Sequence, residues 1–258
     1  IAYCRQTALP SLITLSMGIF KSSVCYSLAD IRPGTDQQEL IERIGQLDAV
    51  SGGAISLQNK MQIIHIYSDD YAFKKNLEDL MQFDEILNLD NFVLLIPPTL
   101  SFKSERLTKT DWRIINSIKD NCRKTDVNIA NELGISPKTV KRRIKYLTEN
   151  TIILFMIDLD TSAADFLSYL LIVKFQKIAS ESYNQIMKIV KNYFYVWRVA
   201  SQEAFIITVF INKLREIEEH VKEIEKLPHV KEIISFVPTR MYYFKSWIDK
   251  LIQNNARN

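Results

Sequence analysis

The chain repeats one order of strands and helices at a nearly constant separation. Apolar runs and helical stripes predict the order strand, helix, strand, strand, helix, strand over residues 21–96 and again over residues 169–237. This order is typical of a ferredoxin-like sandwich, an α+β fold. Similar residues recur 141 to 146 positions apart, which indicates an internal duplication. The matched positions are Phe20 with Phe166, Ser22 with Ser168, Ile63 and Ile64 with Ile206 and Ile207, and Ile96 with Val237.

Each copy is predicted to contain four strands and two helices. In the first copy the strands cover residues 21–31, 54–57, 62–67 and 92–96, and apolar stripes mark helices over 40–47 and 73–81. In the second copy the strands cover 169–175, 195–200, 204–211 and 233–237, and the helices cover 183–190 and 214–224. His65 lies inside a predicted strand, where we expect a hydrogen-bonded or surface histidine and no ligand contact.

The positive charge of the protein is concentrated between the two copies. Residues 101–150 contain 12 Lys and Arg against 6 Asp and Glu, whereas the rest of the 258-residue chain contains 21 against 24. Within this segment, residues 136–146 contain five basic side chains and no acidic one. A solvated helix face is the ordinary interpretation of such a run, so the residues around it decide its role.

Two helices are predicted before the basic run. Thr108 and Asp111 have the spacing of a capping box and precede an apolar stripe over residues 112–118. A second, short helix follows from Asp126 and ends at Gly134, where a helix C-terminus favours a left-handed residue.

The third helix begins with the clearest start signal in the sequence. Ser136 is a predicted N-cap, and Pro137 occupies the first helical position. Val140, Ile144 and Leu147 form a buried stripe, which leaves the basic residues on the exposed face. A short helix, a tight turn and a capped basic helix form a helix-turn-helix, whose last helix enters the DNA major groove.

This trihelical segment resembles the leucine-responsive regulatory protein/AsnC family of prokaryotic transcription regulators. The resemblance rests on Leu107–Asp111, Asn128–Ala130, Leu133–Ser136, Thr139-Val140, Arg143-Ile144, Leu147 and Ile152-Ile153. Two positions depart from the family pattern, because Thr108 replaces an acidic residue and Asn150 replaces a glycine. Asn tolerates a left-handed backbone better than most residues, so we expect the turn at Asn150 to be retained.

The resemblance implies a fold class and a domain organisation. We expect a winged, trihelical helix-turn-helix domain at residues 101–155, flanked by ferredoxin-like βαββαβ domains of the RAM/ACT-like type at 1–100 and 156–258. It implies a cytoplasmic regulator that binds double-stranded DNA and forms a homo-oligomer through its ferredoxin-like domains. The repeat, extended backward, also predicts a first helix-turn-helix upstream of Ile1, which reading the gene would test.

Seven residues of the third helix and its cap are predicted to contact DNA. Lys and Arg neutralise phosphates or read guanine edges, and the hydroxyl groups and the helix N-terminus favour a phosphate. The residues are Ser136, Lys138, Thr139, Lys141, Arg142, Arg143 and Lys145. Spacing alone does not assign which of them reads bases.

An effector site is implied by the resemblance. Small molecules, often amino acids, bind the resembled family near a hairpin turn where a glycine and an acidic residue commonly stand. Ala200 and Glu203 align with these two positions, and Leu57 and Lys60 align with them in the first copy. The candidate effector-binding residues are Ala200, Ser201, Gln202 and Glu203. The alternative is an ordinary hairpin turn that binds no ligand.

Composition argues against several other classes of protein. Cys4, Cys25 and Cys122 are far apart and form no C-x-x-C pair, so we expect neither a disulfide framework nor a zinc site, and a reducing, cytosolic compartment. The six glycines form no nucleotide-binding loop, and with only three histidines we predict no catalytic residue, metal or cofactor. The apolar stretch at 9–20 is shorter than the roughly 20 residues that span a bilayer.

Three alternatives stay open, although the prediction is that the protein is not an enzyme. Siroheme decarboxylases resemble the same family and reuse both of its domains around a tetrapyrrole, which requires converging histidine and arginine side chains. A sensing partner that has lost DNA binding is the second alternative. The third is an acidic protein partner for the basic helix.

Overall fold

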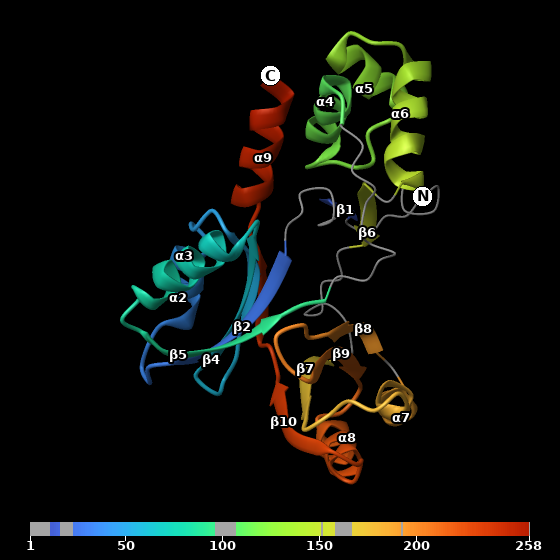
Figure 1. Cartoon of the computed structure of the whole chain (residues 1–258). Coiled ribbons are helices and arrows are strands. Elements are labelled where there is room, and N and C mark those ends of the chain that lie inside the picture. The colour runs from blue at the N-terminus through green and yellow to red at the C-terminus, as the bar shows by residue number, and fades with distance from the viewer. Residues whose placement is uncertain are drawn as a thin grey trace. The chain divides into compact units, whose positions relative to one another are not determined.

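The computed structural model describes residues 11–15, 23–95, 107–150, 152–157, 167–191 and 193–257. The chain divides into two compact units. The first combines residues 1–22, 96–159 and 245–258, and the second combines 23–95 and 160–244. Figure 1 shows the elements of both. The matched positions Phe20, Ser22, Ile96 and Phe166 lie outside the described residues.

The first unit is built on three helices, α4 (Lys109–Ile118), α5 (Asp126–Leu133) and α6 (Pro137–Glu149). Their apolar faces enclose one core, to which Trp112 and Leu147 contribute. After α6 the chain forms β6 (Ile153–Ile157), which pairs antiparallel with β1 (Ser11–Leu15). The three helices and the two-stranded sheet form a winged helix-turn-helix. A further helix, α9 (Ser246–Arg257), belongs to the same unit.

The second unit contains two antiparallel sheets, and the first has the strand order β11-β3-β4-β2-β5. Two helices cover one of its faces (Figure 1) and bury Leu40, Ile41 and Leu80 against Met61 and Ile63. The strands are β2 (Ser23–Ile31), β3 (Val50–Ile55), β4 (Lys60–Tyr67), β5 (Ile86–Val93) and β11 (Arg240–Tyr243), and the helices are α2 (Gln37–Ile44) and α3 (Asp70–Met81).

The second sheet has the strand order β10-β7-β9-β8 and its own pair of helices. Its core is almost wholly aliphatic and aromatic, with Tyr169, Ile186, Ile207 and Ile224 fully buried. The strands are β7 (Leu167–Phe175), β8 (Tyr193–Arg198), β9 (Ala204–Ile211) and β10 (Val230–Phe236), and the helices are α7 (Ser182–Val190) and α8 (Arg215–Glu225). The expected α+β fold is confirmed: a winged helix-turn-helix and two ferredoxin-like halves.

The two sheets repeat one another along the chain. β2 and β7, β4 and β9, and β5 and β10 each begin 144 residues apart. The chain segment that follows the last strand of each half also bonds to the sheet of the other half. The N–H of Thr239 donates to the carbonyl of Ile55 at 2.8 Å, and the N–H of Leu95 donates to the carbonyl of Arg198 at 2.8 Å. Because Leu95 and Thr239 are also 144 residues apart, the two halves exchange chain segments reciprocally.

The predicted position of the second strand is wrong, because β3 runs over Val50–Ile55 and not over residues 54–57. Gly52 and Gly53 made this segment a poor strand candidate, because glycine is unfavourable in strand interiors. A Cβ atom on Gly53 would lie 2.5 Å from the carbonyl oxygen of Gln62, and one on Gly52 would lie 2.8 Å from that of Tyr242. The glycines are therefore needed where β4 and β11 approach β3 on either side.

The predicted position of the last strand of the first half is also wrong, because β5 runs over Ile86–Val93 and not over residues 92–96. Three polar residues made this segment resemble a loop, but each of them has a hydrogen-bond partner in the folded protein. Asn88 donates to Asp30 at 3.4 Å, Asn91 accepts from Ser27 at 2.5 Å, and Asp90 bonds across to β7. A polar edge strand is consistent with these contacts.

None of the described helices is long and apolar enough to cross a bilayer.

Candidate nucleic-acid interface

The start of α6 is fixed by its cap. Ser136 has an extended backbone, and its hydroxyl accepts from the N–H of Thr139 at 3.1 Å while lying 2.9 Å from the Thr139 hydroxyl. Pro137 takes the first helical turn, as predicted. Gly134, with φ 67° and ψ 37°, is left-handed as predicted, which turns the chain sharply from α5 into α6.

The exposed face of α6 gathers most of the residues predicted to contact DNA. Ser136, Lys138, Lys141, Arg142 and Lys145 are exposed, while Thr139 is half-buried. The first acidic residue along the helix is Glu149, whose carboxylate lies 3.7 Å from the Lys145 amine. Both partners are largely exposed, so this contact contributes little to stability and leaves the amine available to a phosphate.

Arg143, the seventh predicted residue, has a different environment. Its Nε donates to Asp111 at 2.6 Å, and its Nη2 donates to the second oxygen of the same carboxylate. Its guanidinium carbon also lies 4.7 Å from the centre of the Tyr146 ring. The bonds to Asp111 raise the pKa of Arg143 further. The structure thus brings six of the predicted residues to one surface and ties Arg143 to α4.

Asp111 joins two helices of the DNA-binding unit. Its side chain is fully buried. It accepts from the N–H of Thr108 at 2.8 Å and from the Thr108 hydroxyl at 2.6 Å, which confirms the predicted capping box. The sequence showed the cap, but it did not show that the same carboxylate holds Arg143.

The C-terminal helix α9 packs on α4, a contact that the sequence analysis did not predict. Ile252 is fully buried in the core of the three helices. Lys119 lies 2.8 Å from Asp249, and Lys245 donates to Asp120 at 3.0 Å. Apolar residues at 247, 248, 251 and 252 form a helical stripe that could have indicated this helix.

The chain turns after α6 as expected, but the prediction that Asn150 adopts a left-handed backbone is wrong. Asn150 has φ −90° and ψ 11°, so its backbone is not left-handed. Its side-chain amide and its N–H both donate to the carbonyl of Tyr146, at 2.8 and 3.1 Å. The side chain and the backbone of Asn150 therefore both satisfy this helix carbonyl, without a left-handed residue.

The four candidate effector residues lie on the turn between β8 and β9. The N–H of Ala200 donates to the carbonyl of Val93 at 2.6 Å, and the hydroxyl of Ser201 accepts from the Val93 N–H at 3.2 Å. Gln202 donates to the carbonyl of Asn91 at 3.3 Å. This turn therefore docks on β5 of the first sheet.

Glu203, the fourth of these residues, is exposed and bonds to two parts of the same half. It lies 2.9 Å from Arg198 and accepts from the N–H of Ile178 at 3.0 Å. That backbone bond and the Arg198 charge lower the pKa of Glu203. The four residues thus all bond to protein groups, and whether they also bind an effector stays a prediction.

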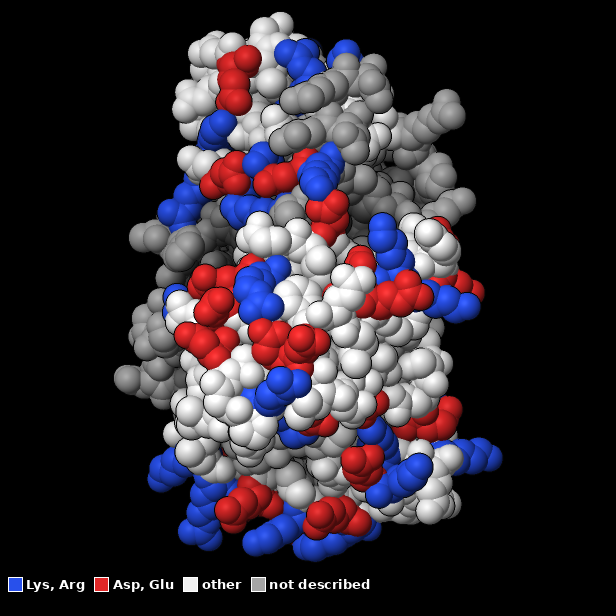
Figure 2. Space-filling view, turned by 90° about the vertical axis from the view of Figure 1, so that its left-hand side faces the viewer, with Lys and Arg blue, Asp and Glu red and all other residues white. Residues whose placement is uncertain are grey.

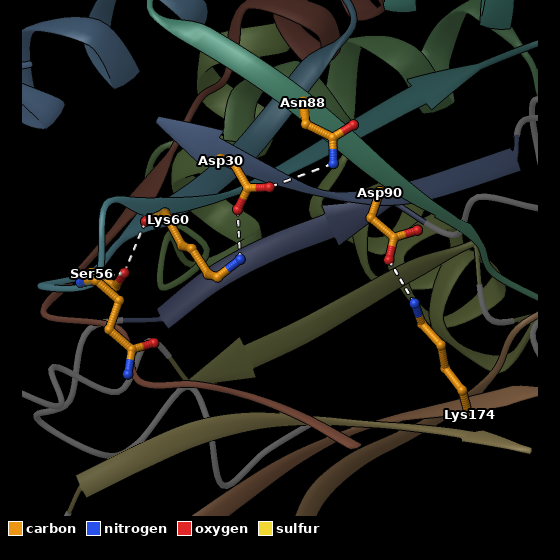
Figure 3. Close-up of polar contacts among 7 residues, drawn as sticks. Asp30, Ser56, Lys60, Asn88, Asp90 and Lys174 are labelled. Carbon is orange, nitrogen blue, oxygen red and sulfur yellow. Dashed lines mark hydrogen bonds and ion pairs between the residues drawn. The ribbon is translucent and has the colours of Figure 1, made fainter. Parts of the chain in front are cut away.

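A second polar contact joins the two sheets beside this turn. Lys174 on β7 donates to Asp90 on β5 at 2.7 Å and lies 3.2 Å from Glu232, with Lys174 only 16% exposed. Figure 3 shows Lys174 and Asp90 pointing toward one another, and a separate cluster in which Lys60 bonds to Asp30. Burial alone would lower the pKa of Lys174, but the two carboxylates outweigh it and raise the pKa.

Acidic and basic side chains are not separated on the face of the protein that Figure 2 draws. On the face drawn in Figure 2, acidic and basic side chains are interspersed over the described residues. Within the described ranges, no group of three or more His, Cys, Asp or Glu side chains could hold a metal ion.

Comparison with known proteins gives one family match. Residues 107–153 are similar to the winged helix-turn-helix DNA-binding family. No curated protein sequence matches the chain.

Among solved structures, the siroheme decarboxylase NirDL has a TM-score of 0.67 at 7% identity, over 99% of this chain and 86% of its own. The same enzyme with an iron-uroporphyrin III analogue has a TM-score of 0.63 at 9% identity, over 95% and 83%. AsnC of E. coli covers 53% of this chain and 94% of its own, with a TM-score of 0.44 and 15% identity. The likeness to NirDL shows a shared fold over nearly the whole chain.

Proposed function

We propose that this protein is an Lrp/AsnC-like transcription regulator that binds double-stranded DNA through α6. The observation that carries the proposal is the exposed face of α6, where Lys138, Lys141, Arg142 and Lys145 stand with no acidic residue before Glu149. This face lies within the segment that matches the winged helix-turn-helix DNA-binding family. Cationic side chains on such a helix release counterions from DNA phosphates, which supplies most of the affinity.

The residues take different parts in this proposal. The N-terminus of α6 presents the Ser136 and Thr139 hydroxyls at the positive end of the helix dipole, an arrangement that favours a phosphate. The four exposed cations contact phosphates or guanine edges in the major groove. Arg143 acts as a positioning residue, because its guanidinium holds α6 against α4 through Asp111.

The ferredoxin-like halves are proposed to sense an effector and to assemble the regulator. Homo-oligomers place two recognition helices about one DNA turn apart, which matches half-site spacing. The turn Ala200–Glu203 is the proposed effector site, with an amino acid as the effector. Its contacts to Val93 and Asn91 support this role, because a ligand there would act on the junction of the two sheets. A regulator of this kind acts in the cytoplasm.

Electrophoretic mobility shift on fragments of genomic DNA tests the proposal. The purified chain is expected to shift a subset of fragments. The triple variant Lys141→Ala/Arg142→Ala/Lys145→Ala is expected to lose the shift. The matched control Lys213→Ala/Lys222→Ala/Lys231→Ala removes the same charge from exposed positions of the second ferredoxin-like half and should retain it. Absence of any shift by the parent protein would overturn the proposal.

A siroheme-decarboxylase-like enzyme is the second candidate, and one observation favours it. The NirDL fold extends over 99% of this chain, well beyond the DNA-binding segment. Two of the three histidines give that chemistry little support: His65 is fully buried and the His220 ring nitrogen bonds to Tyr169. Visible absorbance of the purified protein, and its change on adding haem, tests this candidate. Stoichiometric haem binding together with a failed mobility shift would favour the enzyme.

A further inference from the structure

The exposed face of α6 has a central line of residues and two flanks. Each residue of a helix advances about 100° around the helix axis. Arg142 stands two positions after Val140 and two before Ile144, and both of these side chains are buried in the core of the three helices. Arg142 therefore lies opposite the midpoint of the buried stripe, and its exposed side chain projects away from the core.

Other residues of α6 lie on the flanks of this face. Lys141 is exposed and stands about 100° from Arg142 on one side, and the half-buried Thr139 stands about 60° from it on the other. A helix with its side chains is about 10–12 Å across, and the major groove of DNA is about 12 Å wide. A helix that fills the groove thus turns its central residue toward the base edges and its flanks toward the phosphates of the two walls.

The rotation of α6 about its own axis is fixed by Arg143, the residue next to Arg142. The Nε of Arg143 donates to the buried carboxylate of Asp111 on α4 at 2.6 Å, and its guanidinium carbon lies 4.7 Å from the centre of the Tyr146 ring. Rolling the helix would break these contacts. The contact that holds Arg143 against α4 therefore also holds Arg142 outward, which spacing in the sequence alone could not show.

Charge along the helix favours contact near its N-terminal end. The carboxylate of Glu149, in the last turn, is 61% exposed and lies 3.7 Å from the amine of Lys145. A carboxylate repels phosphates, so the C-terminal turn is disfavoured close to DNA. Side chains on a helix lean toward its N-terminus, so the guanidinium of Arg142 covers the turn that carries Lys138, where α6 has no acidic residue.

The guanidinium of Arg142 is available to a ligand. Within the described ranges, neither Arg142 nor Lys141 forms a hydrogen bond or an ion pair with another residue. A guanidinium presents two N–H groups in one plane, which match the O6 and N7 acceptors of guanine, whereas an ammonium group is a point charge that suits a phosphate. We propose that Arg142 reads a guanine base in the major groove and that Lys141 contacts the phosphate backbone.

This inference rests on the proposed function and names the base that the regulator recognises. A scan with 7-deazaguanine, which pairs normally but lacks the N7 acceptor, tests it on the whole chain. The probe is the genomic fragment that gives the strongest mobility shift, with each guanine replaced in turn. Replacement of one guanine in each half-site is expected to weaken binding by the parent protein about tenfold, as the loss of one hydrogen bond from a charged donor implies.

Two variants at adjacent exposed positions show which side chain is responsible. Arg142→Ala is expected to bind the normal and the substituted fragment equally. Its salt slope should change by less than about 0.5, because a base contact releases no counterion. The matched control Lys141→Ala removes the same charge and should keep the tenfold sensitivity to 7-deazaguanine, while its salt slope becomes less negative by about 1.

Failure of this inference is distinguishable from failure of the proposed function. A parent protein that shifts the fragment but ignores 7-deazaguanine at every position would overturn the assignment of Arg142 and leave DNA binding intact. The same holds if Arg142→Ala keeps the sensitivity, or if Lys141→Ala loses it. A parent protein that shifts no fragment would overturn both.

Discussion

Arg143, in the middle of the basic helix α6, donates from Nε to the buried carboxylate of Asp111 at 2.6 Å. Its neighbour Arg142 is exposed. Two adjacent residues of one type thus have separable roles, and the pair provides a sharp test of the interface.

We expect Arg143→Met to destabilise the helix-turn-helix unit by about 3–5 kcal/mol, because it leaves the charge of Asp111 buried and unpaired. Arg142→Met should change stability by less than about 0.5 kcal/mol and weaken DNA binding instead. Hydrogen exchange of the α4–α6 amides measures the first effect, and mobility shift measures the second. Equal loss of stability in both variants would show that the Asp111 contact does not hold the helix.

The affinity for DNA should fall steeply with salt. If one helix-turn-helix neutralises roughly five phosphates, the logarithm of the association constant falls with the logarithm of salt at a slope of about −4 to −5. Removing Lys141 alone should make the slope less negative by about 1. Fluorescence anisotropy of a labelled operator fragment over a salt series measures both slopes. A slope near zero would mean that α6 does not contact the phosphates.

The α9 helix should be required for the stability of the DNA-binding unit. Ile252→Ala empties a fully buried site in the core that α9 shares with α4, and is expected to cost about 2–5 kcal/mol. Val127→Ala, which truncates a 53% exposed residue of α5, serves as the control and should cost little. Exchange protection of Ile114 and Ile115 amides reports the difference. Unchanged protection in Ile252→Ala would place α9 outside the functional core.

Two glycines of the first half should respond differently to alanine. At Gly53 the new Cβ meets the carbonyl oxygen of Gln62 at 2.5 Å, so the strands must separate at a cost of about 1–3 kcal/mol. At Gly45 it meets the ring of Phe244, and a smaller side chain at position 244 should relieve the clash. In urea denaturation, Phe244→Leu is therefore expected to rescue part of the loss in Gly45→Ala and none in Gly53→Ala. Equal rescue at both positions would refute the assigned contacts.

His65 should make stability depend on pH. Its pKa is about 4 in the folded protein and 6.5 as the ordinary value, so the unfolded chain binds the extra proton first as pH falls. Stability is thus complete above about pH 6.5 and declines toward pH 4, by on the order of 3 kcal/mol. The neighbouring Cys25 does not titrate in this window, because burial raises its pKa to about 11. Subtracting the pH profile of His65→Gln isolates the effect from the carboxylates, and identical profiles would refute it.

Local signals made much of the fold predictable. Capping residues and apolar stripes located α4, α5 and α6, because the N-cap bonds of Thr108 and Ser136 depend on residues three positions away. The repeat of β2 and β4 in β7 and β9 was visible for a similar reason, since its apolar pattern lies within each strand. The seven DNA-binding residues remain a prediction, although the structure places six of them on one surface.

Contacts between distant segments were not predictable. Asp111 and Arg143 are 32 residues apart, and nothing in either local pattern shows that one side chain reaches the other. The polar strand β5 was missed because Asp90 acquires its partner, Lys174, only when the two sheets meet. The hydrogen bond between the His65 ring and the Ser27 hydroxyl likewise joins residues 38 positions apart.

The path of the chain after β10 sets an order for synthesis. β11 completes the first sheet beside β3, and α9 completes the core beside α4, yet both follow the whole second ferredoxin-like half. Neither the sheet that begins at Ser23 nor the helix that begins at Lys109 can reach its final packing until residues 240–257 have left the ribosome. The nascent chain must therefore carry an open sheet edge and an incomplete DNA-binding core while more than half of its length is translated, and both become complete together.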